Sequence, residues 1–224
     1  MPSIITIDGP GGSGKGTLAR LVAFNLSWNI LDSGAIYRIL ALAALERKIN
    51  LNDVNRLCAL AGNIELAFPY SKTITEIRLN GVDVTNSIRQ QYVAEAASQV
   101  AVHAAVRDAL VELQHDQIRM PGLVADGRDL GTIVFPHADL KIFLNASVEA
   151  RAERRYKELI DAGQDVERSA ILRDLEIRDL RDSKRIVAPL VPARDAFIID
   201  GSEKTPAQVL AEVWELCSKK GLTQ

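Results

Sequence analysis

The sequence predicts an α/β fold, with a parallel five-stranded sheet that carries helices on both faces. Five short, largely apolar runs indicate the strands, and the first of them does not alternate, which suits a strand buried on both faces. The runs lie at residues 4–7, 28–32, 123–125, 141–144 and 197–200. Helical patterns separate them, as expected for a parallel sheet, because parallel strands need crossover connections.

Apolar spacing and capping residues mark the helices. Ser33 can cap a helix that runs from about 35 to 47 and is rich in alanine and leucine. A long helical tract is predicted over residues 92–117. Thr205 can cap a last helix over about 206–219, which has proline at its first position.

One stretch in the first half of the chain has a β pattern instead. Apolar and polar residues alternate over 64–68 and again over 74–79. Asn80 and Gly81 then give a tight-turn signal before the short run 82–84. These features predict a small antiparallel β-rich insert in an otherwise α/β body.

The composition is that of an ordinary globular protein of 224 residues, with 47% hydrophobic residues, 25% charged residues and a net charge of -2. No strong excess of charge would draw the whole molecule to nucleic acid or to an anionic membrane. Cys58 and Cys217 form no C-x-x-C pair, and His103, His115 and His137 have no metal-binding spacing. The sequence also lacks a signal-peptide pattern and a bilayer-length apolar run, so we expect a cytoplasmic protein.

The strongest motif lies between the first strand and a helix that begins at Lys15. It reads Gly9-Pro10-Gly11-Gly12-Ser13-Gly14-Lys15-Gly16-Thr17. Glycines allow successive backbone N–H groups to point at phosphate oxygens, while the helix N-terminus and the lysine add positive charge. This pattern is typical of P-loop NTPases and predicts a nucleoside triphosphate site. A glycine-rich turn that binds nothing is the alternative, which the strand–helix context disfavours.

The position after the lysine departs from the usual phosphate loop. Most such loops place Ser or Thr there as a Mg²⁺ ligand, whereas this chain has Gly16 and brings a hydroxyl one residue later, at Thr17. The Gly-Lys-Gly-Thr ending resembles that of nucleoside monophosphate kinases and favours Mg²⁺ held largely through water and phosphate. Asp126, at the end of another predicted strand, is a candidate for the metal's water shell, and the alternatives are a helix cap or a partner for Arg128.

A supply of arginines favours a kinase over other P-loop proteins. Candidates for the carboxyl edge of the sheet are Arg38, Arg128, Arg178, Arg181 and Arg185. Arginine binds phosphate in a bidentate way and stays charged, so these residues can hold a second anionic substrate. A solvated, salt-bridged helical face is the alternative, and it is sufficient for Arg154, Arg155, Arg168 and Arg173.

Four segments resemble bacterial cytidylate kinases, in the expected order over nearly the whole chain. They are Leu31-Asp32-Ser33-Gly34-Ala35-Ile36-Tyr37-Arg38, Ala125-Asp126-Gly127-Arg128-Asp129-Leu130-Gly131-Thr132, Arg178-Asp179-Leu180-Arg181-Asp182 and Ala188-Pro189-Leu190. The resemblance implies one nucleoside monophosphate kinase domain over 1–224, with a monophosphate-binding insert at about 36–100 and a lid at about 154–175. It implies ATP- and Mg²⁺-dependent phosphorylation of CMP and dCMP in pyrimidine nucleotide metabolism. A monomer that binds neither nucleic acid nor membrane is expected.

The same resemblance implies a role for each matching residue. The acceptor, chiefly its phosphate, would be held by Ser33, Arg38, Arg128 and Arg185. The cytosine edge would be read by Ser98, Arg107 and Asp129, and the sugar would be bound by Asp182 and Arg178. Catalytic charge would come from Lys15, Arg128, Arg178, Arg181 and Arg185. From the sequence alone Ser98 and Arg107 look like helix surface. A kinase for UMP or AMP and a non-catalytic nucleotide switch remain alternatives.

Overall fold

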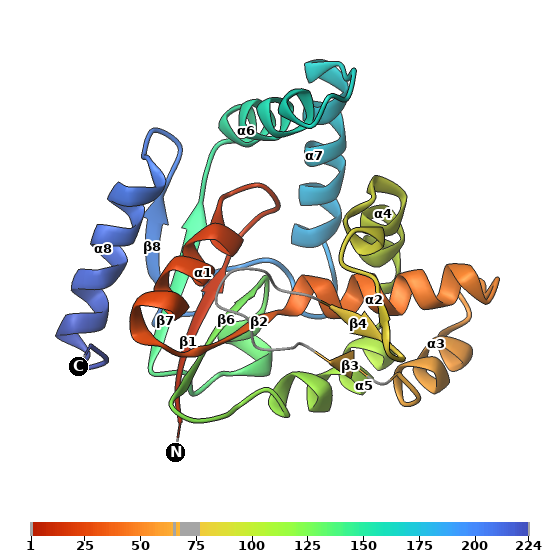
Figure 1. The fold of residues 1–224 in the computed structure, drawn as a ribbon, viewed down its shortest axis with the longest axis horizontal. Helices are drawn as coiled ribbons and strands as arrows, with labels where there is room; N and C mark the ends of the chain where they lie inside the picture. Colours follow the sequence, from red (N-terminus) through yellow and green to blue (C-terminus); the bar gives the residue numbers. More distant parts are fainter. Residues whose placement is uncertain (1, 65, 68–76, 224) are drawn as a thin grey trace. The chain divides into compact units, whose positions relative to one another are not determined.

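The computed structural model describes residues 2–64, 66–67 and 77–223. The chain divides into two compact units (Figure 1). Unit 1 consists of Met1–Leu31 and Ile118–Gln224, and unit 2 consists of Asp32–Gln117. Within the described part of the chain, no helix is long and apolar enough to cross a membrane.

Unit 1 is built on a parallel five-stranded sheet, which confirms the predicted fold class. The strand order is β2-β6-β1-β7-β8. The strands are β1 (Ser3–Asp8), β2 (Asn29–Asp32), β6 (Gly122–Gly127), β7 (Leu140–Asn145) and β8 (Phe197–Asp200). The register of β1 and β6 pairs Asp8 with Gly127. The segments that follow these two residues therefore leave the sheet at the same edge.

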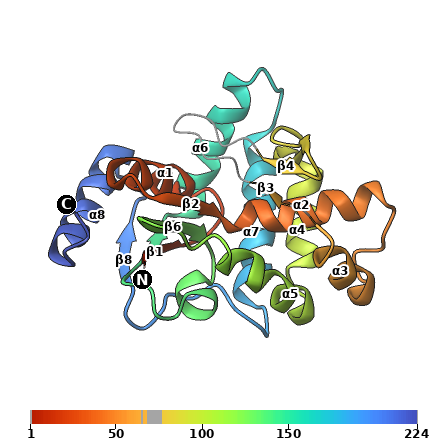
Figure 2. The same cartoon turned by 60° about the horizontal axis from the view of Figure 1, so that its bottom comes forward.

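The helices of unit 1 are α1 (Lys15–Leu26), η2 (Leu130–Val134), α6 (Val148–Asp161), α7 (Arg168–Ser183) and α8 (Pro206–Lys219). Alternate residues of β1 face opposite sides of the sheet. Ile5 and Ile7 are fully buried in a core that they form with α1 and α8, which lie side by side (Figure 2). Thr6 and Asp8 point to the other side, where η2 packs. The expected helical cover of both faces is thus confirmed.

Unit 2 is mainly helical and carries a small antiparallel sheet. Its helices are α2 (Ser33–Glu46), α3 (Val54–Ala61), η1 (Ser87–Arg89), α4 (Gln91–Val100) and α5 (Ala104–His115). Its strands are β3 (Leu66–Ala67), β4 (Arg78–Leu79) and β5 (Val82–Asp83), in that order. Asn80 and Gly81 have φ angles of 49° and 82°, which confirms the predicted tight turn. Residues 65 and 68–76 lie outside the described residues, so parts of both predicted alternating runs, 64–68 and 74–79, are not described.

Helix ends follow their capping residues, with one correction. The side chain of Thr205 accepts from the backbone N–H of Gln208 in a capping box, which confirms the predicted start of α8. The predicted cap at Ser33 is wrong, because Asp32 performs this role and accepts from the N–H of Ala35 at 2.9 Å. Because the capping residue is Asp32, α2 begins one residue later, at Ser33.

The helical tract predicted over 92–117 is two helices, α4 and α5. The break lies at 101–103, where neither proline nor glycine gives a signal in the sequence. His103 precedes α5 in an extended conformation, and its ring Nε2 lies 2.9 Å from the carbonyl oxygen of Leu51. Tertiary packing therefore overrides a continuous helical pattern here.

Candidate active site

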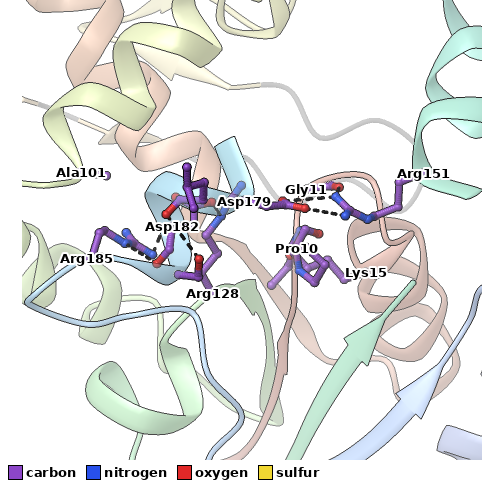
Figure 3. Close-up of polar contacts among 12 residues, drawn as sticks. Pro10, Gly11, Lys15, Ala101, Arg128, Arg151, Asp179, Asp182 and Arg185 are labelled. Atoms are coloured by element: carbon purple, nitrogen blue, oxygen red, sulfur yellow. Dashed lines mark hydrogen bonds and ion pairs between the residues drawn. The ribbon is translucent and has the colours of Figure 1, made fainter. Parts of the chain in front are cut away.

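The glycine-rich loop joins the end of β1 to the start of α1, as predicted. Gly14 caps α1 with a φ of 94°, a left-handed conformation that a side chain would strain. Lys15 is buried, and its Nζ lies 3.1 Å from the carbonyl oxygen of Pro10 (Figure 3). The same Nζ lies 4.0 Å from Oδ1 of Asp126. A phosphate would find backbone N–H groups, a helix N-terminus and an ammonium group here.

The unusual Gly16 has a structural explanation. A Cβ atom at this position would lie 2.9 Å from Oδ2 of Asp126, so the carboxylate occupies the space that Ser or Thr would need. Thr17 keeps a hydroxyl beside the loop, and that oxygen accepts from Nη2 of Arg20 at 3.3 Å. An acidic oxygen close to Lys15 fits a hydrated divalent cation. The described residues include no group of three or more His, Cys, Asp or Glu side chains placed to hold a metal ion.

Two arginines of α6 donate hydrogen bonds to backbone carbonyl oxygens of the loop. Arg151 donates through Nη1 to the carbonyl oxygen of Gly11 at 3.0 Å and forms a bidentate pair with Asp179 of α7 (Figure 3). Arg154 donates to the carbonyl oxygen of Ser13 at 3.2 Å and to that of Gly201. The solvated-face interpretation is therefore wrong for Arg154.

That interpretation does hold for two of its neighbours. Arg155 and Arg168 are more than a third exposed and pair with Glu158 and Glu153, respectively. Arg173 is exposed as well. Such pairs contribute at most about 1 kcal/mol each, because solvent screens them.

A compact group of opposite charges lies at the end of β6 and on α7. Arg128 donates through Nε to Oδ2 of Asp182, and Nη2 of Arg185 lies 3.9 Å from Oδ1 of the same carboxylate (Figure 3). Burial opposes ionisation of Asp182, but the charges of Arg128, Arg185 and Arg178 outweigh it and lower its pKa. Burial likewise disfavours the Arg128 cation, yet Asp182 raises its pKa overall.

Two of these arginines also reach the phosphate loop. An added Cβ on Gly11 would lie 3.5 Å from Nη2 of Arg128 and 3.7 Å from Nη1 of Arg178. Asp129, next along the chain, is buried, and Arg181 lies half-buried in the last turn of α7. The structure thus brings Arg128 and Arg178 to the loop that precedes Lys15, and Arg185 lies beside the carboxylate that binds Arg128.

The predicted acceptor residues of unit 2 include three buried polar side chains. The hydroxyl of Ser33 donates to Oε1 of Gln114 at 2.7 Å, and Arg107 donates to the carbonyl oxygen of Ala101 at 3.2 Å. The Arg107 guanidinium also lies 5.4 Å from the ring centre of Tyr37. Ser98 and Arg107 are only 7% and 5% exposed, so the helix-surface expectation is wrong.

The partly exposed residue of this set is Arg38, on α2. Sequence reasoning missed Gln114, which is 1% exposed and holds Ser33 from another helix. A glutamine in a helical pattern gives no signal of such a contact, because its partner lies 81 residues away.

Comparisons with known proteins agree with this arrangement. The family model described as cytidylate kinase matches residues 5–219. A cytidylate kinase of Aeromonas salmonicida is 48% identical over 213 residues, which cover 95% of this chain and 93% of the relative. One of Azotobacter vinelandii is 50% identical over 214 residues, with the same shares covered. One of Klebsiella pneumoniae is 47% identical over 217 residues, covering 97% of this chain and 96% of the relative.

Each of these relatives is aligned over nearly its whole length, so the likeness is not confined to the phosphate loop that many unrelated proteins share. The family model likewise spans both segments of unit 1 and all of unit 2. The chain is therefore a kinase and belongs to the cytidylate kinase family.

Proposed function

We propose that this kinase transfers the γ-phosphoryl group of ATP to CMP and dCMP, giving CDP and dCDP, with Mg²⁺ as cofactor. The observation that carries the proposal is the approach of Arg128 and Arg178 to Gly11 in the phosphate loop. The loop supplies N–H groups for a triphosphate, and the two guanidinium groups supply charge for a second anion beside it. The printed name of the relatives favours cytidylate as that anion.

On the donor side, the residues of the loop from Gly9 to Thr17 would bind the triphosphate. Lys15 would donate to the β- and γ-phosphates, and the N-terminus of α1 would add its dipole. Asp126 and Thr17 would hold Mg²⁺, mostly through water. Oδ1 of Asp126 lies 4.0 Å from Nζ of Lys15, so this carboxylate lies beside the group that would bind the phosphates. When bound, Mg²⁺ neutralises part of the charge on the phosphate oxygens.

On the acceptor side, Arg128 and Arg185 of unit 1 would bind the phosphate, and Asp129 would read the base. Asp182 would accept from a sugar hydroxyl, with Arg178 beside it. The unit 2 residues Ser33, Arg38, Ser98 and Arg107 are assigned from the family resemblance, the first two to the phosphate and the others to cytosine. An acid that accepts from the cytosine amino group would favour cytosine over uracil.

Catalysis would depend on positioning and charge, with no covalent intermediate. Lys15, Arg128, Arg178, Arg181 and Arg185 would stabilise the charge that spreads over the transferred group. One arginine of this kind contributes a factor of roughly 10³–10⁵ in rate. Water must be excluded, because open access would divert ATP to hydrolysis.

The domain organisation belongs to the same proposal. The chain would be one nucleoside monophosphate kinase domain, with residues of about 36–100 as the monophosphate-binding insert and about 154–175 as the lid. Gly163 joins the two lid helices with a φ of 75° and open space around it, which suits a hinge.

The test is ADP production from ATP and Mg²⁺ with CMP, dCMP, UMP, AMP or no acceptor. We expect rapid turnover with CMP and dCMP, weak turnover with UMP and almost none without acceptor. Arg178→Met should abolish most of the acceptor-dependent turnover, whereas Arg173→Met, an exposed residue of the same helix, should not. Equal ADP formation with and without acceptor would indicate an ATPase or switch, and a preference for AMP or UMP would reassign the acceptor.

A further inference from the structure

Asp8 is a buried carboxylate at the junction between β1 and the phosphate loop. We infer that Asp8 is a positioning residue that holds the Arg128–Asp129 segment in place for the acceptor by binding the two amides that follow it. The inference rests on the proposed function in one respect, since that function assigns Arg128 and Asp129 to the acceptor. Asp8 itself is not proposed to touch either nucleotide.

The contact uses both oxygens of the carboxylate. Oδ1 of Asp8 accepts from the N–H of Leu130 at 2.9 Å, and Oδ2 accepts from the N–H of Gly131 at 2.8 Å. Asp8 is 5% exposed, so water does not compete for these bonds. The partners are separated by more than 120 residues in the sequence, and the two bonds extend the contact between β1 and β6 beyond the last paired residues, Asp8 and Gly127.

The two amides are those that the short helix η2 leaves unsatisfied. The first N–H groups of a helix have no partner within it, and a carboxylate at this end also matches the helix dipole. The carbonyl oxygen of Asp129 accepts from the N–H of Ile133 at 2.8 Å, so the turn begins at Asp129 itself. Asp8 therefore fixes the first turn directly after the base-reading candidate.

The space around the contact is closed. A Cβ on Gly131 would lie 3.0 Å from Oγ1 of Thr6, 3.2 Å from Cδ of Lys141 and 3.3 Å from Oδ2 of Asp8. Lys141 is itself held by Asp195 at 2.9 Å. No room remains for a side chain between Gly131 and β1, and the two hydrogen bonds oppose movement of the segment away from β1.

This arrangement links the donor and acceptor parts of unit 1. The main chain of Asp8 continues directly into Gly9 of the phosphate loop, while its side chain holds the segment that carries Arg128 and Asp129. A misplacement of about 1 Å in such a segment can cost on the order of 10²-fold in rate. Loss of the contact should therefore affect the acceptor far more than ATP.

The test is Asp8→Asn, which keeps the shape but replaces one accepting oxygen with an NH₂ group that faces an N–H donor. The matched control is Asp139→Asn, because Oδ2 of Asp139 accepts from the N–H of Ile4 at 2.8 Å near the opposite end of β1. Burial raises the pKa of Asp8 to about 7, so assays are run at pH 8, where the carboxylate is ionised. The measurements are kcat and KM for CMP and UMP, and ATP affinity without acceptor.

We expect Asp8→Asn to lower kcat/KM for CMP by about 10- to 100-fold and to reduce the preference for CMP over UMP. ATP affinity should stay within about threefold, and Asp139→Asn should leave every value within that range. Values for Asp8→Asn equal to those of the control would overturn the inference. So would a loss of ATP affinity as large as the loss for CMP, which would indicate general damage.

Amide hydrogen exchange tests the contact without any activity. The Leu130 and Gly131 amides should exchange at least about tenfold faster in Asp8→Asn and unchanged in Asp139→Asn. Wild-type protein without acceptor-dependent turnover would defeat the proposed function, while this exchange result would still decide whether Asp8 holds the segment. If Asp8→Asn does not fold, Gly131→Ala displaces the same segment, and full CMP activity in that variant would overturn the inference.

Discussion

Gln114 shows how one buried polar residue can set the geometry of another. Its Oε1 accepts from Ser33 at 2.7 Å, and its Nε2 donates to the carbonyl oxygen of Leu110 at 3.2 Å. Because its amide hydrogens are directed to Leu110, the oxygen must face Ser33. The Ser33 hydroxyl is therefore held in one orientation before any substrate arrives.

Replacing Gln114 by Leu should release the Ser33 hydroxyl and raise KM for CMP by about 5- to 10-fold, as loss of one hydrogen bond predicts. The ATP affinity should not change, because the phosphate loop lies in unit 1. Gln117→Leu is the control, since Gln117 makes the same kind of bond, to the Leu113 carbonyl oxygen at 3.3 Å. Equal effects of the two substitutions on KM would show that the Ser33 contact has no role.

The titration of Asp8 makes a second prediction at this scale. Burial, then the charges of Asp129 and Asp126, raise its pKa from 3.8 to about 7, against the two amide bonds that lower it. Between these values the folded protein retains a proton that the unfolded chain has lost. The resulting stability is fully present below about pH 4 and is lost as pH rises through about 7.

Asp8→Asn lacks this titrating carboxyl group, so the free energy of unfolding of wild type relative to the variant should fall as pH rises from 5 to 8. Over this pH range the change should be on the order of 3 kcal/mol at most, because each pKa unit between pH 5 and the raised pKa of about 7 corresponds to about 1.4 kcal/mol. Urea unfolding at pH 5, 6, 7 and 8 measures it, with Asp139→Asn expected to parallel wild type. Parallel curves for wild type and Asp8→Asn would contradict the raised pKa.

Residues that act through a local pattern could be predicted from the sequence, whereas residues that act through distant partners could not. Lys15 belongs to a contiguous motif, and Arg128 and Arg178 belong to recognisable segments that the sheet gathers at one edge. Asp8 and Gln114 make their key bonds to residues more than 80 positions away. No periodicity or spacing carries that information.

Among the elements, Arg151 of α6 contacts both the phosphate loop and α7 through one side chain. Arg151 is 4% exposed and binds the Gly11 carbonyl oxygen, the Ala146 carbonyl oxygen and Asp179. A stretch of alternating charges gave no reason to separate it from its solvated neighbours. Arg151 is buried because it lies in the first turn of α6, which contacts the phosphate loop at Gly11.

Arg151→Met should lower the free energy of unfolding by about 2–3 kcal/mol, less than a fully buried pair would lose, because Asp179 is partly exposed. Arg155→Met is the control on the same helix, since its pair with Glu158 is exposed and should contribute less than about 1 kcal/mol. Urea unfolding measures both. Equal changes in unfolding free energy would show that the buried contacts of Arg151 carry no stability.

For the whole molecule, the division into units separates two sets of proposed contacts. Every residue of the phosphate loop and its supports Arg151 and Arg154 belongs to unit 1, whereas four of the proposed acceptor residues belong to unit 2. The sequence predicted the α/β body well, because strand and helix patterns are local. It also implied an insert at about 36–100 between two parts of that body, but it did not predict that the second compact unit extends from Asp32 to Gln117.

Amide hydrogen exchange with each nucleotide tests this separation. A non-hydrolysable ATP analogue should slow exchange at residues 9–17 and in the first turns of α6, because its phosphates would occupy donors of unit 1. CMP should slow exchange around Ser33–Arg38 and in α4 and α5, where Ser98 and Arg107 lie. AMP, which should be a poor acceptor, is the control for the CMP arm. The opposite outcome is that the ATP analogue alone slows exchange in unit 2 as much as the two nucleotides together. That outcome would mean that unit 2 responds to the donor, and the proposed assignment of donor and acceptor contacts to separate units would be wrong.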